Sequence, residues 1–162
     1  MTQSKLAINI WTNPIYFLAF GFGSGLLPIA PGTWGTLAAI PLYLLIQNLS
    51  LVDYSIILII ASLLGIWWCD VTERAIGIHD YSGIVWDEIC GYGVTMLAVP
   101  HHWYWIIAGF FLFRLFDIWK PWPISWFNNN VPGGLGVMVD DLVAGVAAWI
   151  VMQILILVLR FS

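Results

Sequence analysis

The sequence predicts an all-α integral membrane protein, a helical bundle of about four to five spans with a re-entrant half-helix at its N-terminus. Of its 162 residues, 61% are hydrophobic and 9% are charged, against roughly 25% charged residues in an ordinary soluble domain. No Asp, Glu, Lys or Arg lies between Lys5 and Asp53, within 89–113 or within 142–159. A bilayer core of about 30 Å needs about 20 apolar residues per helix, so residues 1–162 form a single membrane-embedded domain.

The first apolar stretch, 14–27, is interrupted by Gly21, Gly23 and Gly25. It is too short to cross a bilayer comfortably, so we expect a re-entrant or interfacial half-helix. The segment 28–36 that follows is rich in proline and glycine, which is typical of a turn rather than of a helix. Irregular backbone at membrane depth is tolerated only against protein or a water-filled cavity.

The remaining apolar stretches are each expected to form a span. Their approximate bounds are 36–48, 54–69, 84–99, 103–118 and 139–159. The segments between them are polar or contain proline and glycine, which is typical of loops. The longest connections are 70–81, which is polar, and 120–136, which begins as an interfacial piece rich in tryptophan and proline.

Threading these spans across a membrane brings nearly all of the acids to one face. The acids on this face are Asp70, Glu73, Asp80, Asp87, Glu88, Asp117, Asp140 and Asp141. Asp53 alone falls opposite, and all basic residues except Arg160 share the acidic face. The positive-inside rule therefore places this face in the cytoplasm. The net charge of −4 argues against nucleic-acid binding, which needs a basic surface.

Carboxylates at three helix ends form the strongest candidate for a functional site. They are Asp87, Glu88, Asp117, Asp140 and Asp141. Ionisable residues in membrane segments are costly and indicate function by default. Since these acids have few cations near them, a divalent cation with oxygen ligands, such as Mg²⁺, would relieve their repulsion.

Two other interpretations of these acids stay open. Acids at helix N-termini favour the helix dipole, which explains Asp140 but not Asp117, because Asp117 lies near a helix C-terminus. Arg114 and Lys120 are spaced to share a helix face with Asp117 and could form a structural ion cluster with it. The rival functional class is an ion-coupled transporter that uses clustered buried carboxylates, and a purely structural membrane subunit comes third.

Smaller candidates lie in the loops. His79 and Asp80 could supply acid–base chemistry or contact a substrate, although a single loop histidine is more often only solvated. Thr33 and Thr36 could donate hydrogen bonds to a phosphate, or could simply cap the helix that follows.

Three segments of the chain resemble the phosphatidylglycerophosphatase A family. They are GFGSGLLPIAPGTWGTLAAIP at 21–41, IHDYSGIVWDEICG at 78–91 and FRLFDIWKPWPISWFNNNVPGGLGVMVDDLVAGV at 113–146. The resemblance implies a small multi-pass enzyme of the bacterial inner membrane with its active site facing the cytoplasm. Such an enzyme hydrolyses phosphatidylglycerol phosphate to phosphatidylglycerol and phosphate with Mg²⁺, in phospholipid biosynthesis.

The resemblance also implies roles for particular residues. The catalytic residues would be Asp87, Glu88, Asp117, Asp140 and Asp141. We expect Asp87, Glu88 and Asp141 to bind the metal, and Asp117 or Asp140 to act as a further ligand or as the base for the attacking water. Arg114 and Lys120 would hold phosphate oxygens, with the turn around Thr33 and Thr36 closing the pocket.

Overall fold

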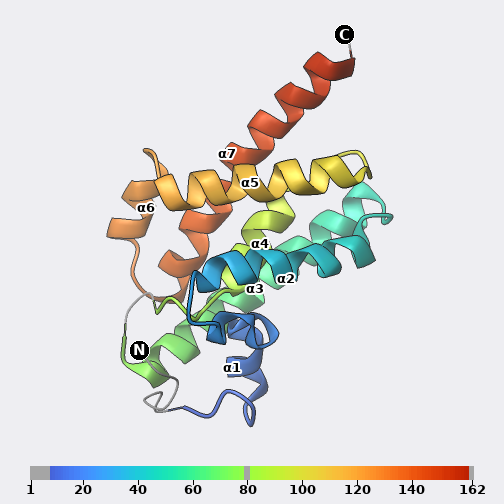
Figure 1. Cartoon of the computed structure of the whole chain (residues 1–162). Helices are drawn as coiled ribbons and strands as arrows, with labels where there is room; N and C mark the ends of the chain where they lie inside the picture. The colour runs from blue at the N-terminus through green and yellow to red at the C-terminus, as the bar shows by residue number, and fades with distance from the viewer. Residues whose placement is uncertain (1–7, 79–80, 161–162) are drawn as a thin grey trace.

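The computed structural model describes residues 8–78 and 81–160, and over these ranges the chain forms helices and no strand. The elements in chain order are α1 (Pro14–Ala19), the 3-10 helix η2 (Gly21–Leu26), α2 (Pro31–Ile46), α3 (Leu51–Ile76), α4 (Trp86–Thr95), α5 (Trp103–Trp119), α6 (Ile124–Asn130) and α7 (Gly133–Arg160) (Figure 1). The predicted all-α class is therefore confirmed for the described part of the chain.

Two of the described helices, α3 and α7, are long and apolar enough to cross a membrane. Only 11% of the most apolar stretch of α3 and 22% of that of α7 are buried inside the protein. Large apolar surfaces of this kind mark contact with lipid or with another protein. The other predicted spans are shorter helices of 16, 10 and 17 residues, namely α2, α4 and α5. Length and composition thus support two spans and give weaker support to the predicted four to five.

Helix α2 begins at Pro31, so the predicted turn over 28–36 is wrong for most of its length. Proline is favoured in the first turn of a helix because its fixed φ suits the helix and its missing N–H would have no partner there. The turn is confined to the residues before Pro31 and ends at Ala30, which has a left-handed φ of 50°. The expected half-helix over 14–27 is present as α1 and η2, and η2 is itself kinked at Phe22 and Gly23, which have positive φ.

Helices also extend into two connections that were predicted as loops. Helix α3 continues into the polar segment 70–81 as far as Ile76 and ends at Gly77, whose φ of 75° is left-handed. Helix α7 begins at Gly133, earlier than predicted, and α6 forms within 120–136. A Cβ atom at Gly134 would overlap the backbone of α3. The close packing of α7 on α3 therefore outweighs the low helix propensity of glycine.

Helix α7 is the central element of the bundle and packs against α3, α4, α5 and α6, while its C-terminal part extends beyond α5 (Figure 1). The short helix α4 is almost wholly buried between α2, α3 and α7. Helices α4 and α7 approach most closely at Gly91 and Gly145. A Cβ atom on Gly91 would overlap the Asp141 carbonyl oxygen, and one on Gly145 would overlap the carbonyl oxygen of Gly91. Small residues at such a crossing let two helix backbones touch.

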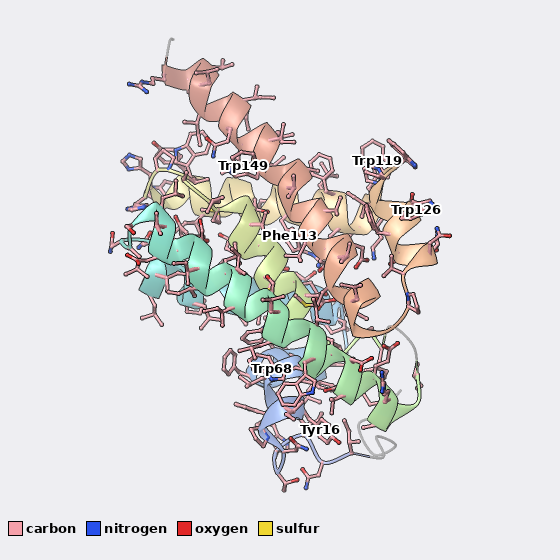
Figure 2. All side chains as sticks on the ribbon, turned by 180° about the vertical axis from the view of Figure 1, so that it is seen from behind. Tyr16, Trp68, Phe113, Trp119, Trp126 and Trp149 are labelled. Carbon is pink, nitrogen blue, oxygen red and sulfur yellow. The ribbon has the colours of Figure 1, made fainter. Side chains whose placement is uncertain are left out.

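Tryptophans collect at the junction of α5 and α6. Trp119 and Trp126 lie at the periphery of the molecule, whereas Phe113 of α5 lies in the interior (Figure 2). Exposed tryptophan is typical of the boundary between a membrane and water, so this junction suits an interfacial position.

Candidate active site

A cavity of about 250 Å³ lies where the N-termini of α2 and α4, the C-terminus of α5 and the first turns of α7 meet. All the acids that the sequence singled out as catalytic line it, together with both predicted phosphate-binding cations. These residues are Asp87, Glu88, Arg114, Asp117, Lys120, Asp140 and Asp141. The fold thus brings together residues from three segments that are far apart in sequence.

The contact between α4 and α7 explains why the acids of these two helices face each other. Asp87 lies one helical turn before Gly91, and Asp141 lies one turn before Gly145. Residues one turn apart share a helix face. Because the two glycines bring the backbones together, the two carboxylates are held close to one another across the same contact.

Oxygens of Asp87, Glu88 and Asp141 converge, since one carboxylate oxygen from each lies within 4.8 Å of the other two. Asp87 and Asp141 are 7% and 3% exposed, and the Glu88 side chain is 12% exposed. Each of the three has a buried oxygen without a hydrogen-bond partner among the described residues. Unpartnered buried carboxylates are costly, and a hard divalent cation such as Mg²⁺ prefers oxygen ligands of this kind. The donor set therefore fits a divalent cation.

Asp117 and Asp140 line the same cavity but are held by cations. Arg114 Nη1 donates to Asp117 Oδ2, and Lys120 Nζ donates to Asp140 Oδ2 at 2.5 Å. Lys120 was expected to be able to share a face with Asp117, but in the structure it pairs with Asp140 on α7. Pairing with Arg114 and Lys120 thus accounts for Asp117 and Asp140, but it leaves a buried oxygen on each of Asp87, Glu88 and Asp141 without a hydrogen-bond partner among the described residues.

Lys120 owes its position to the end of α5, where its left-handed φ of 44° turns the chain out of the helix. Burial alone lowers the pKa of an ammonium group, but the hydrogen bond and charge of Asp140 raise the pKa of Lys120 to about 12. Nζ also donates to Asn128 Oδ1 at 2.6 Å. The sequence analysis did not single out Asn128, which was interpreted only as part of a polar loop. The one indication in the sequence was that this uncharged polar stretch lies within 113–146, the third segment that resembles the family.

Arg114 is the second cation of the cavity. Its Nη1 lies 3.9 Å from Glu88 Oε1, and its Nε has no hydrogen-bond partner among the described residues. The planar guanidinium group matches the oxygens of phosphate. Arg114 therefore links the converging carboxylates to a position where an anionic substrate group can bind.

The structure does not bring Thr33 and Thr36 into the lining of this cavity. Because α2 already includes both residues, the Thr36 hydroxyl donates to the Gly32 carbonyl oxygen within the helix, at 2.9 Å. The residues of this segment that do line the cavity are Ala30, Pro31 and Gly32. A Cβ atom at Gly32 would overlap the Glu88 carboxylate. The predicted substrate contacts His79 and Asp80 lie outside the described residues.

Outward-facing apolar helices and a cavity that holds acids beside an arginine and a lysine suit a membrane-associated enzyme that acts on a phosphate group. Comparison with known proteins gives the particular family. The model of the family "Phosphatidylglycerophosphatase A" matches residues 17–156, and the chain belongs to this family. The resemblance found in the sequence is thus confirmed, and the chain is an enzyme. The transporter alternative gains no support from this match.

Individual relatives agree with the family match. The chain is 50% identical to the phosphatidylglycerophosphatase A of Escherichia coli, over 90% of this chain and 84% of that protein. It is 47% identical to the one of Haemophilus influenzae, over 86% of each chain. A protein of Bacteroides thetaiotaomicron, provisionally named a phosphatidylinositol-3-phosphatase, is 42% identical over 83% of this chain and 88% of its own length. No solved structure shows a significant match.

Proposed function

We propose that the chain hydrolyses the terminal phosphate monoester of phosphatidylglycerol phosphate, giving phosphatidylglycerol and inorganic phosphate in phospholipid biosynthesis. The observation that carries this proposal is the buried group of Asp87, Glu88 and Asp141 beside Arg114 and Lys120, each acid having an oxygen that no described residue contacts by a hydrogen bond. The names of the E. coli and H. influenzae relatives support this choice of substrate.

Mg²⁺ is the proposed cofactor, held by Asp87, Glu88 and Asp141. When bound, such an ion polarises a phosphoryl oxygen and lowers the pKa of a water molecule that it carries. Arg114 and Lys120 bind the remaining phosphate oxygens and offset the charge that develops on them. Asp117 and Asp140 are the candidates for the base that accepts the proton of the attacking water, since each is oriented by a cation at the edge of the cavity.

The proposed setting is the inner membrane of a bacterium, with about four to five spans and the cavity facing the cytoplasm. The length and outward apolar surface of α3 and α7 support a membrane setting. The clustering of Arg114 and Lys120 at the acidic end supports the orientation, by the positive-inside rule.

A cysteine placed at the exposed Ser82, in a Cys69→Ala/Cys90→Ala background, should resist an impermeant thiol reagent added to intact cells. Labelling from outside would invert the orientation.

The test of the activity is phosphate release by the purified protein in detergent, with Mg²⁺ or with EDTA. The substrates are phosphatidylglycerol phosphate, phosphatidic acid and phosphatidylinositol 3-phosphate. We expect Mg²⁺-dependent release that is fastest from phosphatidylglycerol phosphate. Release from another of these lipids with none from phosphatidylglycerol phosphate would overturn the proposed substrate.

A further inference from the structure

A second cavity, of about 230 Å³, lies between α2, α3 and α4 and has an almost entirely apolar lining. Its lining includes Ala39 of α2, Leu58 and Ala61 of α3, and Ile89 of α4. Leu45 also lines it and is 79% exposed, so the cavity reaches the outer apolar surface. An apolar cavity of about 150 Å³ is already large enough to bind benzene.

Helix α4 forms a wall of both cavities. Trp86, Ile89 and Gly93 line the apolar cavity, whereas Asp87 and Glu88 line the acidic one. The residues of the apolar cavity are spaced three and four apart, so they share one face of α4. The two acids lie on another face of the same helix. Helix α4 therefore stands between the two cavities, with one on each side of it.

Helix α2 connects the same two cavities along its length. Gly32 lines the acidic cavity and Tyr43 lines the apolar one, and these two residues lie about 16 Å apart along the helix at 1.5 Å per residue. The headgroup of phosphatidylglycerol phosphate contains two glycerol units joined by a phosphodiester. Its extended length, from terminal phosphate to acyl ester, is comparable to this separation.

The hydroxyl of Tyr43 is the second observation that points to a ligand. Tyr43 is 3% exposed, and its Oη has no hydrogen-bond partner among the described residues. The neighbouring Tyr54 hydroxyl, in contrast, donates to the Gly93 carbonyl oxygen at 2.7 Å. Buried polar groups in proteins are nearly always paired. The ester carbonyl of a lipid would supply the acceptor that Tyr43 lacks.

We propose that the apolar cavity binds one acyl chain of the phospholipid substrate while its terminal phosphate occupies the acidic cavity. This inference rests on the proposed function, because it requires a lipid phosphate as substrate. The headgroup then lies along α2, and the acyl chain enters between α2 and α3. Recognition of the chain is hydrophobic, so it favours long-chain lipid phosphates over water-soluble phosphate monoesters of the same headgroup.

The first experiment fills the cavity with Ala61→Leu and uses Ala75→Leu as the matched control. Both alanines are half-buried on α3, but Ala75 does not line the apolar cavity. For each protein, kcat/KM is measured with dipalmitoyl phosphatidylglycerol phosphate and with its deacylated headgroup. We expect the ratio of the two values to fall about tenfold in Ala61→Leu, as if contact with a few methylene groups were lost. It should keep the wild-type value in Ala75→Leu.

An unchanged ratio in a folded Ala61→Leu protein would overturn the acyl-chain site. Failure of the wild-type protein to release phosphate from either substrate would instead overturn the proposed function.

Photolabelling of the wild-type protein tests the cavity independently of turnover and of the folding of a variant. Dipalmitoyl phosphatidylglycerol phosphate with a diazirine in one acyl chain should label peptides containing 39–46 and 57–61 more strongly than the exposed end of α7. Equal labelling would indicate surrounding lipid only and would overturn the site.

Discussion

Acids in two regions of the molecule differ in how the structure uses them. Asp53 is exposed in the first turn of α3, where it accepts a hydrogen bond from the Ser50 hydroxyl at 2.7 Å. Ser50 in turn caps the helix by accepting from the Asp53 backbone N–H, and an acid at this position favours the helix dipole. Asp87 and Asp141 are buried, and each has an oxygen without a hydrogen-bond partner in the described part of the chain. The difference shows which acids indicate a functional site. A carboxylate that is buried without a hydrogen-bond partner does so, whereas an acid that merely interrupts an apolar sequence does not.

The largest expected effect tests whether the buried group holds a cation. EDTA should abolish phosphate release from phosphatidylglycerol phosphate, and excess Mg²⁺ should restore it, because the three converging carboxylates repel one another and Arg114, 3.9 Å from Glu88 Oε1, supplies a single positive charge beside them. Phosphate release is measured on the purified protein before and after the metal is returned. Full activity in metal-free buffer would remove the proposed mechanism.

Neutralising single members of the buried group is the next test. Asp87→Asn, Glu88→Gln and Asp141→Asn should each lower phosphate release by about a thousandfold, as loss of one essential electrostatic contact can do. In detergent without Mg²⁺ these variants should melt at or above the wild-type temperature, because the substitution relieves repulsion among buried acids. Activity that falls only in step with the melting temperature would make these carboxylates part of the scaffold.

The glycine contact between α4 and α7 should show an intermediate effect. Gly145→Ala forces the helices apart and should destabilise the fold by about 1 to 3 kcal/mol. It should also raise the Mg²⁺ concentration needed for half-maximal phosphate release, since Asp141 moves away from Asp87. The control is Val146→Ala, at a residue that is 45% exposed. An unchanged Mg²⁺ requirement in a folded Gly145→Ala protein would show that the glycine contact does not position the carboxylates of the site.

The smallest effect is expected at Asp53, the exposed member of the comparison. Asp53→Asn should keep phosphate release within about twofold of wild type and cost at most about 1 kcal/mol of stability, because only a helix-end interaction is weakened. Phosphate release and thermal melting are measured side by side. An inactive but folded Asp53→Asn protein would show that exposure does not distinguish acids that are needed for activity from acids that are not.

The sequence was sufficient to predict the all-α class and the gathering of the acids. Long uncharged stretches predicted the helices, and the charged residues fell at their ends, so threading the chain brought Asp87, Asp117 and Asp141 to one level. The pairing of Lys120 with Asp140 could not be predicted in the same way. It depends on the turn after α5 and on the seating of α6, which places Asn128 against the same ammonium group.

Helix starts were the least predictable features. Proline and glycine before Thr36 were consistent both with a turn and with the first turn of a helix, and the left-handed conformation of Ala30 decides between them. Likewise, the glycines before Val137 predicted a loop by propensity alone. Their close contact with the backbone of α3 becomes visible only in three dimensions, and it lengthens α7 at its start.

The shared wall formed by α4 has a consequence for how the two products depart. Phosphate would leave the acidic cavity into water, whereas the dephosphorylated lipid would leave the apolar cavity past Leu45 into the hydrocarbon of the membrane. Two exits into two different media do not obstruct each other. If lipid departure limits the rate, turnover should then follow the viscosity of the bilayer and be insensitive to the viscosity of the surrounding water.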